Sequence, residues 1–289
     1  MEKTELQALI SLLDDPDEAI FQQLKSKLID FGDQVIPVLE EAWEDASYDE
    51  VYHKRIESII HTIQFQKVKS ALTVWKQSAE KDLLEGILIL SRYQYPDLDR
   101  TFIDTLLQTM ERDIWLEFNA NLTALEKVRI INHVLFDVHG FGGNSENYHS
   151  VYNSYINTVF ESRKGTPLSL SVIYMVLAQR LKLPIYGVNL PRHFILAYQD
   201  IPFLADSNPQ VLFYINPFSK GVVLLKREVQ HFLKQLKIEE KDEYFLPCST
   251  AEILIRVLNN LIYSYSLEKE VKKVEELNNL LVIIQNSNG

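Results

Sequence analysis

Three polar side chains in the second half of the chain have the types and the spacing of a catalytic group. His193 begins one predicted strand, over residues 193–198, and Asn216 ends the next, over residues 211–216. In an antiparallel hairpin the start of one strand lies beside the end of the other, so these two side chains are expected to be neighbours. Ser169 falls in the first turn of a predicted helix, whose free amides attract anions. Together they suggest a hydrolase or acyltransferase in which His193 deprotonates Ser169 and Asn216 orients the imidazole.

The helix that carries Ser169 is predicted from a start signal and a long apolar run. Thr166 can cap the free amides, and Pro167 suits the first helical position, where its missing N–H costs nothing. From residue 168 to residue 181 the helix is apolar nearly all the way round, so it must be buried on most sides. It is too short to span a bilayer, and Pro184 follows its end. The sequence therefore predicts a core helix that leads into an antiparallel sheet.

The same residues also have a structural interpretation, and we favour it over the catalytic one. In it, Ser169 is a buried, hydrogen-bonded helix residue and His193 has only a structural role. The single cysteine, Cys248, precedes a capped helix and is predicted to be a buried structural thiol. Glu161 and Arg163, just before the core helix, are predicted to form an ion pair that braces its start.

A loose group of histidines and one aspartate suggests a metal site only weakly. His133 and Asp137 share a helix face, with His139 and His149 nearby, but no third ligand has suitable spacing. Solvated surface histidines are the preferred interpretation. The sequence therefore predicts neither a metal ion nor a cofactor.

Composition narrows the possible partners. A formal net charge of −11 and the lack of any Lys/Arg cluster argue against nucleic acid and anionic membranes. A hydrophobic content of 46% with 24% charged residues is typical of a globular protein. One cysteine excludes a disulfide within the chain and a cysteine-based zinc site. The first residues lack the features of a signal peptide, so we expect a cytoplasmic protein.

The chain is expected to have three parts, of which the first and last are helical. Residues 1–120 read as amphipathic helices, and two similar helix–break–helix segments, 20–43 and 83–110, suggest either a HEAT-like stack or an irregular bundle. Residues 246–289 are predicted to form a helical hairpin that begins at a capping box at Ser249. That hairpin is either one TPR-like unit or a packing arm, and a single unit cannot form a solenoid.

The middle part, residues 121–245, carries a family resemblance. Its motifs are, in order, GFGGNSENY, NSYI, ESRKGTPLSLSVIY, LPIYGVNLPRHF and YINPF. This order resembles the transglutaminase-like proteins of the SirB type. The resemblance implies an α+β fold: a helical N-terminal region, then a papain-like or transglutaminase-like core with a small antiparallel sheet, then C-terminal helices. It also implies that active relatives use a Cys–His–Asp triad.

The resemblance places the triad on residues that differ from it at two positions. The cysteine position falls at Pro167, which has no nucleophile, while the histidine is His193 and the carboxylate position is Asn216. The resemblance thus implies a pseudoenzyme without thiol chemistry. Our first hypothesis is a non-catalytic interaction or regulatory module that binds another protein, with the helical N-terminal half as docking surface. The second is a hydrolase or acyltransferase that uses Ser169, His193 and Asn216.

Overall fold

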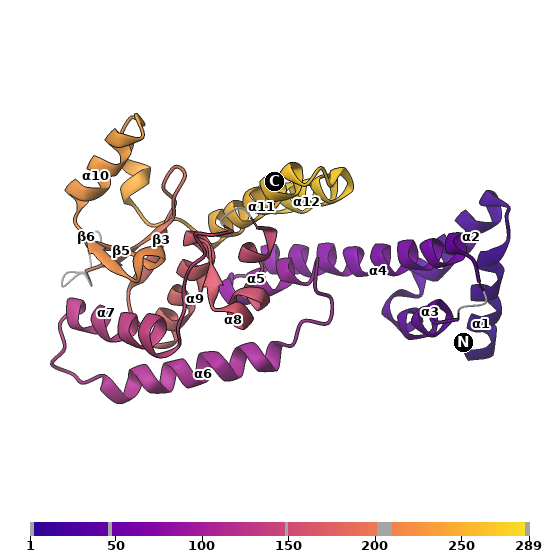
Figure 1. Cartoon of the computed structure of the whole chain (residues 1–289), viewed down its shortest axis with the longest axis horizontal. Helices are drawn as coiled ribbons and strands as arrows, with labels where there is room; N and C mark the ends of the chain where they lie inside the picture. The colour runs from indigo at the N-terminus through magenta and orange to yellow at the C-terminus, as the bar shows by residue number, and fades with distance from the viewer. Residues whose placement is uncertain (1–2, 46–47, 148–149, 201–209, 287–289) are drawn as a thin grey trace. The chain divides into compact units, whose positions relative to one another are not determined.

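The computed structural model describes residues 3–45, 48–147, 150–200 and 210–286, and Figure 1 shows the chain. Most of these residues are helical, and one small antiparallel sheet lies in the second half, which confirms the predicted α+β class. The chain divides into two compact units, residues 1–71 and residues 72–289. The division into three parts with boundaries at 120 and 245 stays a prediction.

The first unit is helical. Its elements are α1 (Lys3–Ser11), η1 (Leu12–Asp14), α2 (Glu18–Asp30), η2 (Gly32–Val35), α3 (Ile36–Trp43) and the first part of α4 (Glu50–Gln77). Asp17 caps α2, since its side chain accepts a hydrogen bond of 2.8 Å from the backbone N–H of Ala19. The helices enclose one apolar core, in which Leu28, Leu39 and Ile56 are fully buried.

The second unit contains the rest of the helices in the described chain. They are α5 (Leu83–Ser91), α6 (Arg100–Glu117), α7 (Ala124–Asn132), the π-helix η3 (His133–Val138), η4 (Val151–Ser154), α8 (Ile156–Ser162), α9 (Pro167–Arg180), η5 (Pro217–Ser219), α10 (Lys226–Gln235), η6 (Asp242–Phe245), α11 (Thr250–Leu267) and α12 (Val271–Gln285). None of the helices in the described residues has the length and apolar character needed to cross a membrane.

The sheet consists of four antiparallel strands in the order of the chain. They are β3 (Ile185–Val188), β4 (Ile195–Gln199), β5 (Val211–Asn216) and β6 (Val222–Leu224). Leu196 pairs with Ile215, so the residues just before β4 lie beside the end of β5, as the sequence predicts. A separate parallel pair, β1 (Gly142–Gly143) and β2 (Lys164–Gly165), precedes α9. The hairpin loop between β4 and β5 lies mostly outside the described residues.

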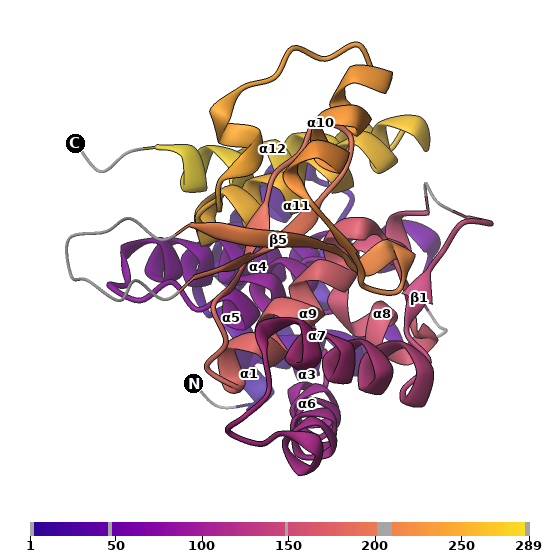
Figure 2. The same ribbon diagram turned by 90° about the vertical axis from the view of Figure 1, so that its left-hand side faces the viewer.

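Helix α9 is the core of the second unit, as its apolar sequence predicts. Every residue from Pro167 to Ala178 is buried. Its start is a capping box, in which the side chain of Thr166 accepts from the backbone N–H of Ser169. Helix α9 contacts β3 and β4, while α10 packs on the other face of the sheet through Val229 and Leu233. Figures 1 and 2 show these two helices on opposite sides of the strands.

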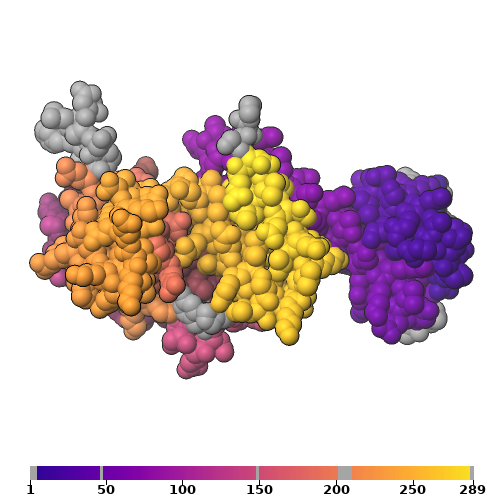
Figure 3. All heavy atoms as spheres, turned by 90° about the horizontal axis from the view of Figure 1, so that it is seen from above, coloured from indigo at the N-terminus to yellow at the C-terminus, as the bar shows by residue number. Residues whose placement is uncertain are grey.

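The C-terminal helices form the predicted hairpin. Ser249 and Glu252 make the capping box that begins α11. Leu258 and Leu261 on α11 and Leu277 on α12 are fully buried. Figure 3 shows these helices, in yellow, lying against the rest of the second unit, where α11 contacts α5 and η4. This packing brings one face of α11 to the start of α9.

Candidate functional site

His193 and Asn216 form a hydrogen-bonded pair, as the sequence predicts. Nε2 of His193 lies 3.3 Å from Oδ1 of Asn216. An amide oxygen can only accept, so Nε2 carries the hydrogen and Nδ1 is left as an acceptor. The amide nitrogen of Asn216 in turn donates to Oγ of Ser219 at 3.2 Å, which orients the side chain. The asparagine therefore holds the imidazole in one tautomer.

Burial favours the neutral form of His193. Desolvation lowers the pKa of its imidazole below the usual 6.5, and the nearby positive charge of Arg256 lowers it further. The hydrogen bond to Asn216 raises the pKa, by less than desolvation lowers it but by more than Arg256 does. The ring also packs on Phe232, with the ring centroids 5.7 Å apart. At neutral pH His193 is thus an uncharged ring that can accept a proton or a hydrogen bond.

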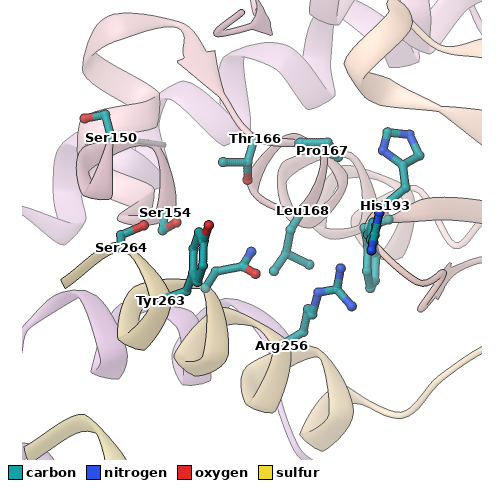
Figure 4. A pocket seen from close by; sticks show the side chains of 12 residues that line it. Ser150, Ser154, Thr166, Pro167, Leu168, His193, Arg256, Tyr263 and Ser264 are labelled. Carbon is teal, nitrogen blue, oxygen red and sulfur yellow. The ribbon is translucent and has the colours of Figure 1, made fainter. Parts of the chain in front are cut away.

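A cavity of about 550 Å³ opens beside His193, above the start of α9. It is lined by Ser150, Ser154, Thr166, Pro167, Leu168, Arg192, His193, Phe194, Arg256, Asn260, Tyr263 and Ser264. Figure 4 shows α9 and His193 on one side, with Arg256 and Tyr263 on the facing helix α11. The volume is within the usual range for small-molecule and peptide side-chain sites.

Pro167, at the position to which the family resemblance assigns the nucleophile, lines this cavity together with His193. Pro167 is the first residue of α9, where helices present free N–H groups. Proline carries neither a nucleophilic atom nor an N–H of its own. The side chain of Pro167 therefore contributes only carbon atoms of its ring to the cavity wall beside His193.

The hydroxyl of Ser169 is committed to the capping box of α9. It accepts from the backbone N–H of Thr166 at 2.9 Å and lies 3.1 Å from Oγ1 of Thr166. Ser169 is not among the residues that line the cavity of His193, and no hydrogen bond joins the two in the described chain. The structure thus brings together His193 and Asn216 but not Ser169, so the geometry gives the predicted serine no base.

The only cysteine of the chain lies away from the cavity lining. Burial raises the pKa of the Cys248 thiol to about 12, with a further contribution from the nearby Glu252 carboxylate. Its backbone N–H donates to the carbonyl of Gly187 at 2.8 Å, so Cys248 extends the edge of the sheet. A thiol that stays protonated is a poor nucleophile, in agreement with the structural role predicted for it.

The weaker candidates have structural contacts. Nδ1 of His133 lies 3.5 Å from a carboxylate oxygen of Asp137, and Nε2 of His139 lies 2.9 Å from a carboxylate oxygen of Asp113. No group of three potential metal ligands occurs among the described residues, and His149 lies outside them.

The predicted ion pair between Glu161 and Arg163 is not formed in the described chain. The guanidinium of Arg163 instead lies over the ring of Phe141, 4.8 Å from its centroid, and its buried Nη1 has no hydrogen-bond partner. Arg163 caps the C-terminus of α8 in the left-handed conformation, with φ 60°. That backbone turn is what the sequence reasoning did not foresee.

Sequence reasoning also missed the wall of the cavity that α11 provides. Arg256, Asn260 and Tyr263 are spaced four and three residues apart, so they share one helix face and line the cavity together. Nη1 of Arg256 donates to Oδ1 of Asn189 at 3.2 Å, which ties α11 to the end of β3. The sequence signal that could have indicated this wall is the stripe of polar residues along one face of α11, a helix that is otherwise largely apolar.

Comparison with known proteins agrees with this architecture. The sequence profile described as "Transglutaminase-like superfamily" matches residues 101–259, a range that includes the sheet and, of the cavity wall on α11, Arg256. A UPF0162 protein of Xylella fastidiosa (strain 9a5c) is 33% identical over 206 residues, which cover 68% of this chain and 70% of that protein. A UPF0162 protein of Buchnera aphidicola is 26% identical over 207 residues, or 70% of this chain and 73% of that protein.

A eukaryotic protein matches a similar length of the chain. F-box only protein 21 of Mus musculus is 26% identical over 238 residues, which cover 74% of this chain but only 38% of that protein. The matching region therefore also occurs as one part of a larger protein. No solved structure matches the chain significantly.

Proposed function

Because the chain belongs to the transglutaminase-like superfamily and to the family of UPF0162 proteins, we propose that it is a non-catalytic binding module of the SirB type. Its cavity keeps the position and the histidine of a transglutaminase-like site but holds a segment of a partner protein instead of reacting with it. Two expectations stay predictions. One is that the helical N-terminal half provides a further docking surface, and the other is that the protein is cytoplasmic.

The observation that carries this proposal is that a proline, Pro167, lines the cavity beside His193. We infer that Pro167 stands where active relatives place their thiol, and proline cannot attack a carbonyl. Cys248, the only thiol of the chain, is absent from the cavity lining, and its pKa is raised to about 12. A pocket in which a proline stands beside the base, and whose described lining has no thiol, supports binding rather than turnover.

The alternative, a hydrolase or acyltransferase that uses Ser169, is the weaker proposal. Its nucleophile would have to leave a capping box in which the hydroxyl contacts Thr166 through two groups. Loss of a helix cap costs about 1 kcal/mol, and the side chain would still have to reach a cavity that it does not line. This alternative is worth testing because the hydrogen-bonded pair of His193 and Asn216, which would supply its base, is present.

The test combines selection of binding peptides with a search for turnover. Peptides selected from a random library on the wild-type protein are measured against two variants of α11, Asn260→Trp, which fills the cavity, and Ser266→Trp, which adds the same ring on the exposed face. We expect Asn260→Trp to lose binding and Ser266→Trp to keep it. Ser154→Trp, on another wall, repeats the block in case the first variant is unstable.

The same peptides, incubated with the protein and analysed by mass spectrometry, report on catalysis. We expect neither cleavage nor acyl transfer. Turnover that disappears in both His193→Ala and Ser169→Ala would replace the proposal with the serine hydrolase. Selected peptides that bind Asn260→Trp as well as they bind the wild type would show that the cavity is not the binding site.

A further inference from the structure

We propose that the cavity recognises a carboxylate group of the bound peptide, with the guanidinium of Arg256 as its main partner. This inference rests on the proposed function and names the chemical group that the module selects. Two sources supply such a group, an Asp or Glu side chain and the C-terminal carboxylate of a chain, and both present the same planar anion.

The charge of the cavity lining is opposite to that of the protein. The whole chain has 40 acidic and 29 basic residues. The cavity lining nevertheless includes two arginines, Arg192 and Arg256, and no Asp or Glu is among its described residues. Positive charges that are concentrated in a concave site of an acidic protein attract an anionic ligand, and the described lining has no carboxylate that would repel it.

Arg256 is positioned for this role by its contacts. It is half-buried on α11, and Figure 4 shows its guanidinium directed between Leu168 and His193. The bond from Nη1 to Oδ1 of Asn189, 3.2 Å long, fixes the plane of the guanidinium. The five N–H donors of arginine form a rigid fork, which matches the two oxygens of a carboxylate. The positive charge is therefore oriented before a ligand arrives.

The surroundings of Arg256 suit a short piece of polypeptide. Leu168 and Phe194 provide apolar surface, and Asn260, Tyr263 and Ser154 provide groups that hydrogen-bond to a peptide backbone. The start of α9 adds a partial positive charge on the same side of the cavity, although it is not needed for the assignment. This mixture is typical of a site that holds an apolar side chain and one anionic group together.

A carboxylate fits the charge of the site better than a phosphate does. A phosphate monoester carries between one and two negative charges and is usually held by several arginines. Of the two arginines in the lining, Arg256 is half-buried and Arg192 is exposed at the corner before β4. His193 adds no charge, because its ring is neutral at pH 7. One partly desolvated guanidinium balances one negative charge. The observations therefore favour the monoanion.

The experiment uses four small blocked amino acids and records the backbone NMR spectrum of the full-length protein. N-acetylglutamate N-methylamide has only a side-chain carboxylate, and N-acetylleucine has only a C-terminal one. N-acetylglutamine N-methylamide has neither, and N-acetylphosphoserine N-methylamide carries a phosphate. We expect at least one carboxylate probe to shift resonances of the cavity residues and to bind more tightly than the glutamine probe.

Variants assign the contact to an arginine. Arg256→Gln is expected to weaken carboxylate binding by about tenfold or more, the size of a lost charged hydrogen bond. Arg192→Gln, at an exposed corner, is expected to weaken it by about two- to fivefold, and it keeps the test valid if Arg256→Gln does not fold. Arg227→Gln removes an exposed arginine of α10 that does not line the cavity, and it should leave binding unchanged.

Three results would overturn the inference. They are equal binding of the glutamine probe, tighter binding of the phosphoserine probe, and carboxylate binding that is unchanged in Arg256→Gln. Failure here is distinct from failure of the proposed function. Library peptides that bind in the cavity without any carboxylate would leave the binding module intact, whereas a carboxylate that is bound and then processed would leave only the recognition intact.

Discussion

The two walls of the cavity were built by different parts of the sequence. One wall consists of residues 166–168, at the start of α9, and residues 192–194, just before β4, and we call it the sheet wall because both segments adjoin the sheet. It follows from local signals: a helix cap, a proline and a strand start. The other wall, which we call the helix wall, comes from α11 and consists of Arg256, Asn260 and Tyr263. The capping box at Ser249 predicts where α11 begins but not which residues it packs against. The sheet wall carries His193 and the exposed Arg192, and the helix wall adds the half-buried Arg256.

This difference has a consequence for the chemistry of the site. A catalytic site needs a nucleophile and a base at fixed separation, and beside the base His193 the sheet wall has Pro167, while Ser169 does not line the cavity. A binding site needs oriented donors and an enclosed surface, and both walls contribute these. The comparison therefore favours recognition, and variants that act on one wall at a time can test it.

The largest expected effect comes from the core beneath the sheet wall. Leu177 of α9 is completely buried, so Leu177→Ala should lower the free energy of unfolding by about 2–5 kcal/mol. Leu116→Ala, at a side chain of α6 that is 68% exposed, is the matched control and should change it by less than about 0.5 kcal/mol. Urea unfolding followed by circular dichroism measures both. A loss below about 1 kcal/mol for Leu177→Ala would mean that α9 is not the core of this unit.

Much of the sheet wall could be predicted because each of its parts has a short-range cause. Thr166 and Pro167 mark the start of α9, and the pairing of neighbouring strands places His193 beside Asn216. These features depend on residues adjacent in sequence or on a single hairpin. The fold class could be predicted for the same reason, because a helix that is apolar on all sides has to lie in the core of a domain.

The remaining features depend on packing between distant segments. Arg256 meets Asn189 across 67 positions of the chain, and no local pattern specifies that contact. Ser169 has the right residue type for a nucleophile, but its direction was decided by a capping box with Thr166 that uses up its hydroxyl. Arg163 lies over Phe141 and has a left-handed backbone, and its residue type alone indicated neither.

The second prediction compares two thiols, one placed in the sheet wall and one native. Pro167→Cys in a Cys248→Ser background puts a thiol at the start of α9 and in the cavity of His193, and both features favour the thiolate. Its pKa should fall below the roughly 8.5 of a free cysteine. Cys248 in the wild type, whose pKa is raised to about 12, should react far more slowly. Alkylation rates measured between pH 5 and pH 10 give the pKa of the introduced thiol and show whether Cys248 stays slow over the whole range.

The control for this comparison removes the histidine as well. In a Pro167→Cys, Cys248→Ser, His193→Ala protein, the alkylation rate should move back toward that of an ordinary thiol. A rate that follows a free cysteine with or without His193 would show that the two positions do not interact. The family triad would then be assigned to the wrong residues, although the fold would stand.

The third prediction separates the role of His193 in the site from its role in the fold. The side chain is half-buried and makes one hydrogen bond with Asn216, so His193→Ala should cost about 1 kcal/mol of stability. We expect the same variant to weaken the binding of library-selected peptides. Thermal unfolding and peptide affinity, measured on one preparation, distinguish the two effects. A collapse of the melting temperature would instead make His193 a structural centre of the sheet wall.

The smallest expected effect is a shift in the titration of His193, which reports on both walls at once. Arg256 lowers the pKa of the imidazole from the helix wall, and the hydrogen bond of Asn216 raises it from the sheet. Arg256→Gln should therefore raise the pKa toward 6.5, and Asn216→Ala should lower it, as followed by NMR of the ring nitrogens.

The sign of the pH dependence follows from the same shift. Because the pKa of His193 is lower in the folded protein than the unfolded value of 6.5, the unfolded state binds more protons below that pH. The contribution of His193 to stability is therefore fully present above pH 6.5 and decreases as the pH falls toward the folded pKa. In Arg256→Gln this acid-induced loss should become smaller, because the difference between the two pKa values shrinks. If the titration of His193 were the same in Arg256→Gln and in the wild type, the two walls would not interact electrostatically, and Arg256 would lie too far from the imidazole to share a ligand with it.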